Sequence, residues 1–285
     1  MGLTAASNIQ SLRAARQVSL STAALSDTFE RLSSGLRINS ASDDPAGLAV
    51  AEQLRSSASI AGVAIRNAND GLSITAVADS ALSSIADVLV RMSELAEQAA
   101  NGTFTNVQRS ALSSEFLALG SEVERISRTT TFNNVSLLSG SANITLQVGL
   151  DSSANSQITI QSVIGTLSSL GIGTVAGALS YSLTGTTSDF AATAALNALS
   201  AVTTAIDTIS RVRGVVGANQ SRLEVAVNNL AAARENFLLA ESRIRDADVA
   251  LETSQMLRLQ ILQQAGTAVL AQANQQPALV LGLLQ

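Results

Sequence analysis

Two neighbouring acidic residues are the first candidates for chemistry in this chain. Asp43 and Asp44 are the only adjacent acidic pair in the sequence, and paired carboxylates can act as general acid and general base. They stand directly before Pro45 and a long segment of periodic apolar residues. Side-chain oxygens in that position cap the start of a helix. Helix capping is therefore the favoured interpretation, and acid–base chemistry the weaker one.

Other reaction chemistry lacks its required groups. A serine nucleophile needs a base such as His or Lys, but the sequence has no His, and all 17 of its basic residues are Arg. Because there is also no Cys, disulfides, thiolate chemistry and the commonest metal ligands are excluded. Gly171, Gly173 and Gly177 do not have the G-x-G-x-x-G spacing of a phosphate loop. We expect no catalytic residue, cofactor or metal site.

Composition points instead to helices that pack in thin layers. Of the 285 residues, 46% are hydrophobic but only 2% are aromatic. Aromatic side chains are the large fillers of globular cores, so their scarcity favours an elongated helical bundle. The net charge of -5 and the absence of Lys argue against nucleic acid as a partner, since binding its backbone needs a dense basic face.

The first residues carry no sign of a cleaved leader. Residues 1–20 lack the basic start and the continuous apolar run of a signal peptide. No apolar run approaches the roughly 20 residues that a membrane helix needs. We therefore expect no membrane insertion, and we expect any export to use a route that cleaves no signal peptide.

Three segments carry the three-and-four spacing of amphipathic helices. The first is expected to begin at Pro45 and to end near Asn101-Gly102. A shorter helix is expected around 112–126, stopping before 129–131, and a long one over 199–237. Stripes of this kind favour side-by-side packing as a long, antiparallel, coiled-coil-like bundle.

The composition shifts to Ser, Thr, Gly and Asn between 139 and 189. Apolar and polar residues alternate at 144–148 and 158–160 around a turn-like segment, which predicts a β-hairpin near 142–161. The glycine-rich stretch at 165–189 is expected to be an exposed, weakly structured loop. The predicted fold is therefore mainly α, with a small β-hairpin region.

Both ends of the chain carry apolar seams with no partner in their own neighbourhood. The front seam consists of Val18, Leu25, Phe29, Leu32 and Leu36, and the back seam of Leu262, Ala265, Val269 and Ala273. Seams of this kind pack against partner helices. We expect these residues to serve subunit packing, by pairing the two ends with each other and then with neighbouring copies.

Several long segments resemble bacterial flagellins. These segments are 32–51 (LSSGLRINSASDDPAGLAVA), 66–73 (RNANDGLS), 131–134 (TFNN), 217–224 (GANQSRLE), 240–248 (AESRIRDAD) and 272–275 (QANQ). The region between the front and back blocks is short. The resemblance therefore implies a short form that lacks the outer variable domains of larger flagellins.

The resemblance implies a structural subunit that self-assembles into the flagellar filament for swimming motility. It implies that 1–44 and 241–285 form a terminal coiled-coil domain around an inner tube. It further implies that 45–172 and 190–240 form a rod-like domain, and that 173–189 is a short surface loop. The location would be the extracellular bacterial flagellum, reached through the flagellar type III export apparatus without a cleaved signal peptide.

The resemblance also implies partners and surface sites. Besides the homo-polymer, they are an export chaperone on the C-terminal helix, the filament cap and hook-associated proteins. The positions that match a patch for an animal flagellin receptor are Arg91, Leu95, Gln98 and Glu115, with packing between subunits favoured as the main role of Leu95 and Gln98. The composition of the loop makes O-linked sugar a further hypothesis at Ser152, Ser153, Thr186, Thr187 and Ser188.

Two alternatives stay open. A hook–filament junction protein of the same superfamily would share the terminal helices, but it usually lacks so complete a set of rod motifs. A non-flagellar helical-bundle surface protein would share the apolar repeats, but it would not need the turn between Ser34-Gly35 and Gly47.

Overall fold

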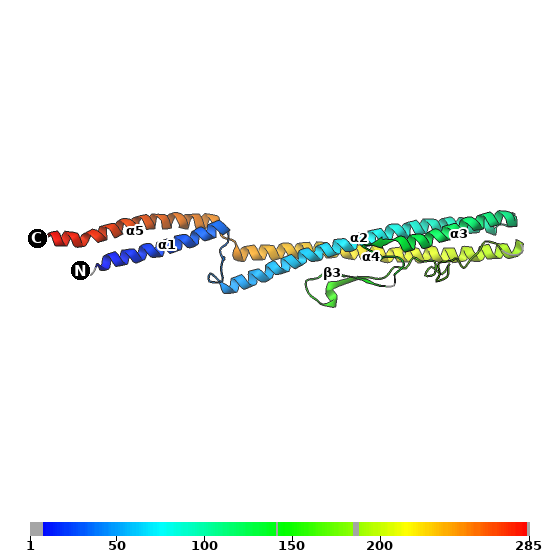
Figure 1. Ribbon diagram of the computed structural model, residues 1–285, viewed down its shortest axis with the longest axis horizontal. Coiled ribbons are helices and arrows are strands. Elements are labelled where there is room, and N and C mark those ends of the chain that lie inside the picture. The colour runs from blue at the N-terminus through cyan, green and yellow to red at the C-terminus, as the bar shows by residue number, and fades with distance from the viewer. Residues whose placement is uncertain (1–7, 141, 185–187, 284–285) are drawn as a thin grey trace. The chain divides into compact units, whose positions relative to one another are not determined.

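The computed structural model describes residues 8–140, 142–184 and 188–283. In chain order the elements are α1 (Ile9–Ser34), α2 (Pro45–Ala100), α3 (Asn106–Thr129), β1 (Thr131–Phe132), β2 (Val135–Ser136), β3 (Ile144–Gln147), a 3-10 turn (Ala154–Ser156), β4 (Gln157–Ile160), α4 (Ser188–Arg245) and α5 (Val249–Leu283) (Figure 1). The prediction of a mainly helical fold with long helices and a small antiparallel hairpin is confirmed.

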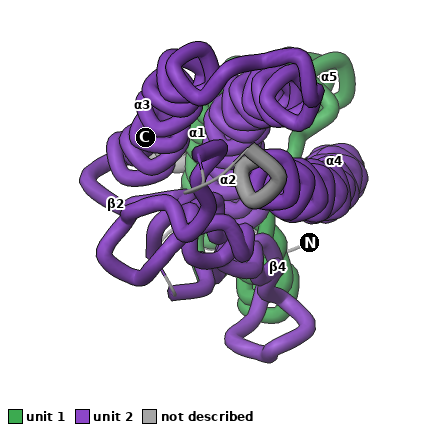
Figure 2. Tube along the Cα trace, turned by 90° about the vertical axis from the view of Figure 1, so that its right-hand side faces the viewer, with its two compact units in different colours: residues 1–58, 235–285 green, residues 59–234 purple. Residues whose placement is uncertain are grey.

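The chain forms two compact units (Figure 2). Unit 1 consists of 1–58 and 235–285, and unit 2 consists of 59–234. Both unit boundaries fall inside continuous helices, α2 and α4, whereas the predicted domain boundaries lie near the ends of those helices. The assignment of an inner-tube domain and a rod domain concerns the assembled filament and stays a prediction.

Unit 2 has one main apolar core, to which α2, α3 and α4 all contribute. Leu82, Ile85 and Leu89 of α2 are fully buried there, together with Phe116 of α3 and Ile209 of α4. These residues belong to the stripes that the three-and-four spacing identified. The spacing therefore predicted correctly which face of each helix is buried in this unit.

The start of α2 explains the adjacent carboxylates. Asp44 Oδ1 accepts hydrogen bonds from the backbone N–H groups of Ala46 at 3.1 Å and Gly47 at 2.9 Å, so this side chain caps the helix. Asp43 Oδ2 accepts from the backbone N–H groups of Ser40 at 2.9 Å and Asn39 at 3.0 Å, and these bonds lower the pKa of the Asp43 carboxyl. The capping interpretation is confirmed for Asp44, whereas Asp43 stabilises the turn at 39–40 that precedes the helix.

The end of α2 is capped by a side chain of the next helix. The buried guanidinium of Arg109, on α3, donates from Nε to the Ala99 carbonyl at 2.9 Å and from Nη2 to the Asn101 carbonyl at 3.0 Å. The last turn of α2 holds no basic residue of its own. Thr105 and Gln108 cap the start of α3 reciprocally through a capping box. Together these contacts fix the turn between α2 and α3.

The predicted hairpin is present, and a second one was not predicted. β3 and β4 pair antiparallel with Ile144 opposite Ile160, inside the predicted range of 142–161. β1 and β2 form a shorter hairpin whose turn residues, Asn133 and Asn134, have positive φ angles of 46° and 65°. Asparagine tolerates this left-handed backbone better than other non-glycine residues. The Asn-Asn pair was therefore an available turn signal in the sequence.

The expectation of an exposed, weakly structured loop at 165–189 is wrong for several apolar residues of its described part, although half of the residues at 165–184 are exposed. Leu167, Leu170, Ile172 and Leu183 have exposed fractions of 0 to 4% and belong to the main core. The segment has no long periodic stripe, and its isolated apolar residues are buried one at a time between turns. The remaining part, 185–187, lies outside the described residues.

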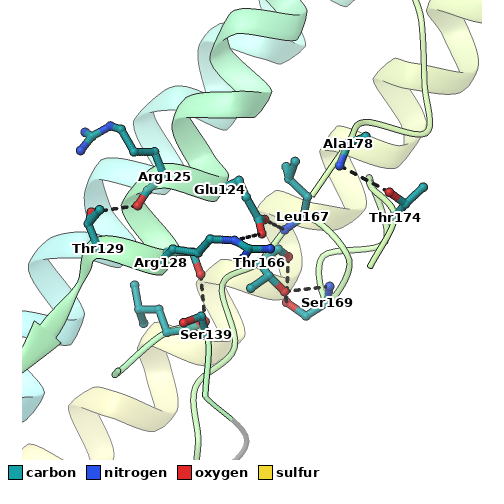
Figure 3. Close-up of polar contacts among 12 residues, drawn as sticks. Glu124, Arg125, Arg128, Thr129, Ser139, Thr166, Leu167, Ser169, Thr174 and Ala178 are labelled. Atoms are coloured by element: carbon teal, nitrogen blue, oxygen red, sulfur yellow. Dashed lines mark hydrogen bonds and ion pairs between the residues drawn. The ribbon is translucent and has the colours of Figure 1, made fainter. Parts of the chain in front are cut away.

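A buried carboxylate fixes this segment to α3 (Figure 3). Glu124 Oε2 accepts a hydrogen bond from the backbone N–H of Leu167 at 3.1 Å, and Oε1 is paired with Arg128 Nε at 2.6 Å. Gly177, at φ +83°, packs so closely that a Cβ there would lie 3.1 Å from Glu124 Oε1. Glu124 thus holds the segment by its backbone, which apolar periodicity could not reveal.

Among the described residues, one helix is long and apolar enough to cross a membrane by length and composition. That helix is α2, which meets the criterion by the mean hydropathy of an 18-residue window and not by a continuous apolar run. The criterion is weak, since core helices of soluble proteins also meet it. In unit 2 the apolar face of α2 is occupied by the core.

Candidate assembly interface

In unit 1, α1 and α5 lie side by side and run antiparallel (Figure 1). Each helix turns a stripe with steps of three and four residues toward the other, and every member is buried or half-buried. The α1 stripe is Ser11, Ala14, Val18, Ser21, Leu25, Thr28 and Leu32, and the α5 stripe is Glu252, Met256, Leu259, Gln263, Gly266, Leu270 and Ala273. We call α1 and α5 the terminal pair, and these two stripes its seam.

Polar contacts are frequent in and beside this seam. They join Asn8 Nδ2 to the Ala273 carbonyl at 2.8 Å, Ser11 Oγ to Asn274 Oδ1 at 2.6 Å, Gln263 Nε2 to Thr22 Oγ1 at 3.1 Å, and Arg31 Nη1 to Glu252 Oε1 at 3.7 Å. Polar residues at seam positions specify register at a cost in stability. The polar residues of the seam therefore fix how α1 and α5 align, beside apolar seam residues such as Leu25 and Leu259.

One glycine lets the two helices approach closely. A Cβ placed on Gly266 would lie only 2.8 Å from Val18 Cγ2. Valine is branched at Cβ and has little freedom to turn away. Any larger residue at 266 must therefore push α1 and α5 apart.

We expect Gly266→Leu to weaken the terminal pair by about 1–3 kcal/mol, the usual cost of overpacking, although leucine is the better helix former. Hydrogen exchange of the α5 backbone amides should become faster throughout the pair. Ala265→Leu is the matched control, because Ala265 is exposed and points away from α1. Equal exchange in the two variants would contradict close packing at Gly266.

Short backbone pairing connects the end of α1 with the end of α4. Gly35 ends α1 in a left-handed conformation, at φ 71°. Leu36 then pairs with Asp246 as an isolated antiparallel bridge, and the Arg37 N–H donates to the Arg245 carbonyl at 2.5 Å. The prediction that Leu36 continues the helical front seam is wrong, because α1 ends at Ser34 and the chain leaves the helix at Gly35.

The rest of the predicted front seam divides between buried and exposed positions. Leu25 is buried against α5, and Val18 and Leu32 are half-buried at the same seam. Phe29 is 49% exposed and lies beside the stripe. Whether Phe29 contacts a neighbouring copy is a matter of assembly and stays a prediction.

The predicted back seam is not the face that α5 turns toward α1. Ala273 is buried in the seam, but Leu262, Ala265 and Val269 are exposed, with fractions of 44% for Leu262 and 59% for Val269. The prediction that Leu262, Ala265 and Val269 pack against α1 is therefore wrong. The neighbouring stripe has the same spacing, and its Gln263 and Gly266 are used because they suit the polar, close-packed contact.

The terminal pair consequently carries large apolar side chains on its outside. They are Leu12 at 69% and Leu20 at 56% exposure on α1, and Leu251 at 56%, Leu257 at 56%, Ile261 at 66%, Leu262 at 44% and Val269 at 59% on α5. We call these residues the outer face. Exposed apolar surface of this extent marks an interaction surface.

Three of the four residues in the predicted receptor patch lie on the surface of unit 2. Arg91 pairs with Glu115 at 2.8 Å and with Glu94 at 3.0 Å, and these hydrogen bonds, the one to Glu115 first, raise the pKa of Arg91. Gln98 is exposed. Leu95 is only 1% exposed and belongs to the core, so its side chain is not available for binding in this structure.

The predicted sugar sites are described only in part. Ser152 and Ser153 are exposed in the turn between β3 and β4, where Asp151 accepts hydrogen bonds from the backbone N–H and the hydroxyl of Ser153. Thr186 and Thr187 lie outside the described residues. Ser188 is the first residue of α4, and its side chain also lies outside them. O-linked sugar at these positions stays a prediction.

Comparison with known proteins identifies the family. Residues 6–143 match the bacterial flagellin N-terminal helical region, and residues 199–284 match the bacterial flagellin C-terminal helical region. A flagellin of Halalkalibacterium halodurans is 39% identical over 279 residues, which are 98% of each chain. A flagellin of Bacillus subtilis is 38% identical, again over 98% of each chain. The chain belongs to the bacterial flagellin family.

Membership of the flagellin family gives the function and the location. The chain is a structural subunit of the flagellar filament, which is extracellular, and it polymerises with itself. A solved structure from Vibrio parahaemolyticus, assigned as a flagellar hook-associated protein, superimposes with a TM-score of 0.57 over 72% of this chain and 99% of that one. At 17% identity it shares the fold alone, whereas the relatives at 38–39% are flagellins.

Proposed function

We propose that polymerisation of this flagellin runs through the outer face of the terminal pair, which packs against the terminal pairs of neighbouring copies. The observation that carries the proposal is the arrangement of α5, which keeps Met256, Leu259 and Leu270 in the seam but leaves five large apolar residues exposed: Leu251, Leu257, Ile261, Leu262 and Val269. Apolar burial contributes about 25 cal/mol per Å². Contact between copies would bury the apolar side chains of α5 that its pairing with α1 leaves exposed.

The proposed positions of the chain segments in the filament follow from this interface. Residues 1–44 and 241–285 would form the inner tube of the filament, and 45–172 with 190–240 the rod-like layer around it, with 173–189 as the surface loop. The main core and the hairpin of unit 2 support a rod layer that is folded before assembly. The predicted seam residues Phe29, Leu262, Ala265 and Val269, all exposed, would contact neighbouring copies.

Partners beyond the filament follow from the same surface. An exposed apolar outer face in the free subunit would be a liability in the cytoplasm, and an export chaperone on the C-terminal helix would cover it. Export would use the flagellar type III apparatus without a cleaved signal peptide. The filament cap and hook-associated proteins would meet the chain at the two ends of the polymer. We propose no catalytic activity and no membrane insertion.

The predicted receptor patch on unit 2 is mostly polar and exposed. Arg91, Gln98 and Glu115 present polar groups at the surface, whereas Leu95 supports them from the core. For Gln98 we propose packing between copies as the main role, and for the exposed patch as a whole recognition by an animal flagellin receptor as a secondary one.

Removing the terminal pair tests the proposed interface. A chain lacking 1–40 and 246–285 should stay helical and monomeric, because the main core of unit 2 lies entirely between these cuts. Electron microscopy after heating and cooling should show filaments from the full chain and none from the shortened one. Filaments formed by the shortened chain would show that assembly does not depend on α1 and α5.

A further inference from the structure

The Asn101–Gly102 step, which follows α2, is open to an intramolecular reaction. It is the only Asn-Gly sequence in the chain, and both residues are exposed. Glycine has no side chain to hinder approach to its nitrogen, and apart from the two chain neighbours no group of the described protein lies within 4 Å of the place where a Gly102 Cβ would be. The backbone nitrogen of Gly102 can therefore approach the side-chain carbonyl carbon of Asn101, and water has access to both.

One hydrogen bond activates the electrophile. The backbone N–H of Thr103 donates to Asn101 Oδ1 at 3.2 Å. When a nucleophile adds to Asn101 Cγ, negative charge develops on Oδ1. A fixed donor at that oxygen stabilises this charge, as donors do in an oxyanion hole.

Two further hydrogen bonds activate the nucleophile. The attacking group is the Gly102 amide after it loses its proton, and its charge is shared with the carbonyl oxygen of Asn101. That oxygen accepts from Arg109 Nη2 at 3.0 Å and from the Phe104 N–H at 3.3 Å. Arg109 is only 1% exposed. A buried guanidinium favours the anionic form of the group to which it donates.

We propose that Asn101–Gly102 is a self-modification site, at which the fold promotes deamidation of Asn101. The Gly102 nitrogen forms a bond to Asn101 Cγ, the bond between Cγ and the side-chain nitrogen breaks, and ammonia leaves with the amide proton. The product is a five-membered succinimide. Water then opens this ring at either carbonyl and gives aspartate or isoaspartate, so that water is consumed and ammonia released, with no change of oxidation state.

Arg109 also favours one of the two products. In isoaspartate the main chain runs through the former side chain, and the former backbone carbonyl of Asn101 becomes a free carboxylate. Arg109 already donates to the oxygen of this group, and a charge-assisted hydrogen bond is stronger than a neutral one. The amount of isoaspartate formed should therefore exceed that of aspartate. Either product adds a negative charge at residue 101, which lines a surface pocket together with Glu94 and Glu97.

The test compares the folded chain with a peptide of the same sequence. The full chain and a synthetic peptide covering 96–107, which lacks Arg109, are incubated at neutral pH and body temperature. Peptide mapping by mass spectrometry then follows the succinimide, aspartate and isoaspartate at 101. We expect the folded chain to react about tenfold faster than the peptide, a modest part of what one well-placed donor contributes in an oxyanion hole.

A variant and an internal reference complete the experiment. Gly102→Ala should slow the reaction strongly, since its added Cβ meets no other group and leaves the fold intact. Asn155, exposed and followed by Ser156, serves as the reference within the same digest. Equal or slower reaction of the folded chain relative to the peptide would overturn the proposal, as would an unchanged rate in Gly102→Ala.

Discussion

Filament assembly should fail when a charge is placed on the outer face of the terminal pair. We expect Ile261→Glu to raise the protein concentration needed for polymerisation about a hundredfold, because an unpaired carboxylate buried at a subunit contact costs about 3 kcal/mol. Ile261 is 66% exposed in the single chain and lies on the side of α5 that faces away from α1. Val269→Glu should have the same effect two turns further along. Sedimentation and electron microscopy of seeded assembly would measure the change.

The matched control places the same charge on another exposed valine. Val175 is 89% exposed in unit 2, and Val175→Glu should assemble like the unchanged chain. Circular dichroism should show equal helix content in all variants, since none of the substituted side chains is buried in the single chain. If Ile261→Glu formed filaments at the concentration that the unchanged chain needs, the outer face of α5 would not be the assembly interface.

The ends of α2 could be predicted from the sequence because its apolar spacing and its start and stop residues agree, whereas α3 and α4 extend beyond the expected 112–126 and 199–237. Pro45 after two carboxylates and Asn101-Gly102 define the ends of α2, and the structure places both ends at those residues. The β3–β4 hairpin was predicted for a similar reason, since alternation and turn residues lie within one short segment. Local signals of this kind do not depend on distant parts of the chain.

The contact between α1 and α5 was harder to predict because two neighbouring stripes of α5 share one spacing. Hydrophobicity favoured the stripe with Leu262 and Val269, yet α5 turns Gln263 and Gly266 toward α1. The choice depends on the partner helix, where Val18 needs space and Thr22 offers a hydroxyl. For a subunit that also packs against copies of itself, the most apolar stripe need not be the one that is buried within the chain.

The segment after the hairpin was mispredicted for a different physical reason. Its fold depends on a side chain from far away in sequence, the Glu124 carboxylate, which accepts the hydrogen bond of the Leu167 N–H. Single apolar residues such as Leu167 and Leu183 are then buried without any periodic pattern. A composition rich in Gly, Ser and Thr indicates irregular backbone, but it does not indicate exposure.

A hydrogen bond from the side chain of one helix to the backbone end of another also predicts a large effect of substitution at Arg109. We expect Arg109→Leu to lower the free energy of unfolding of unit 2 by about 3 kcal/mol, because it removes a buried donor and leaves the carbonyl of the buried Ala99 without this hydrogen bond. The guanidinium donates to the carbonyls of Ala99 and Asn101, at the negative end of the helix dipole of α2. The last turn of α2 has no basic residue that could replace it. Urea unfolding followed by circular dichroism would measure the loss.

Arg91→Leu is the control for this prediction, since it removes an arginine that also makes hydrogen bonds to two groups. Arg91 pairs with Glu94 and Glu115, but its side chain is 51% exposed. Ion pairs in contact with water contribute less than about 1 kcal/mol, so this variant should unfold nearly as the unchanged chain does. A loss at Arg109 no greater than that at Arg91 would mean that the capping of α2 by α3 does not stabilise the unit. A clear difference would show that the buried arginine stabilises the unit more than the exposed one does.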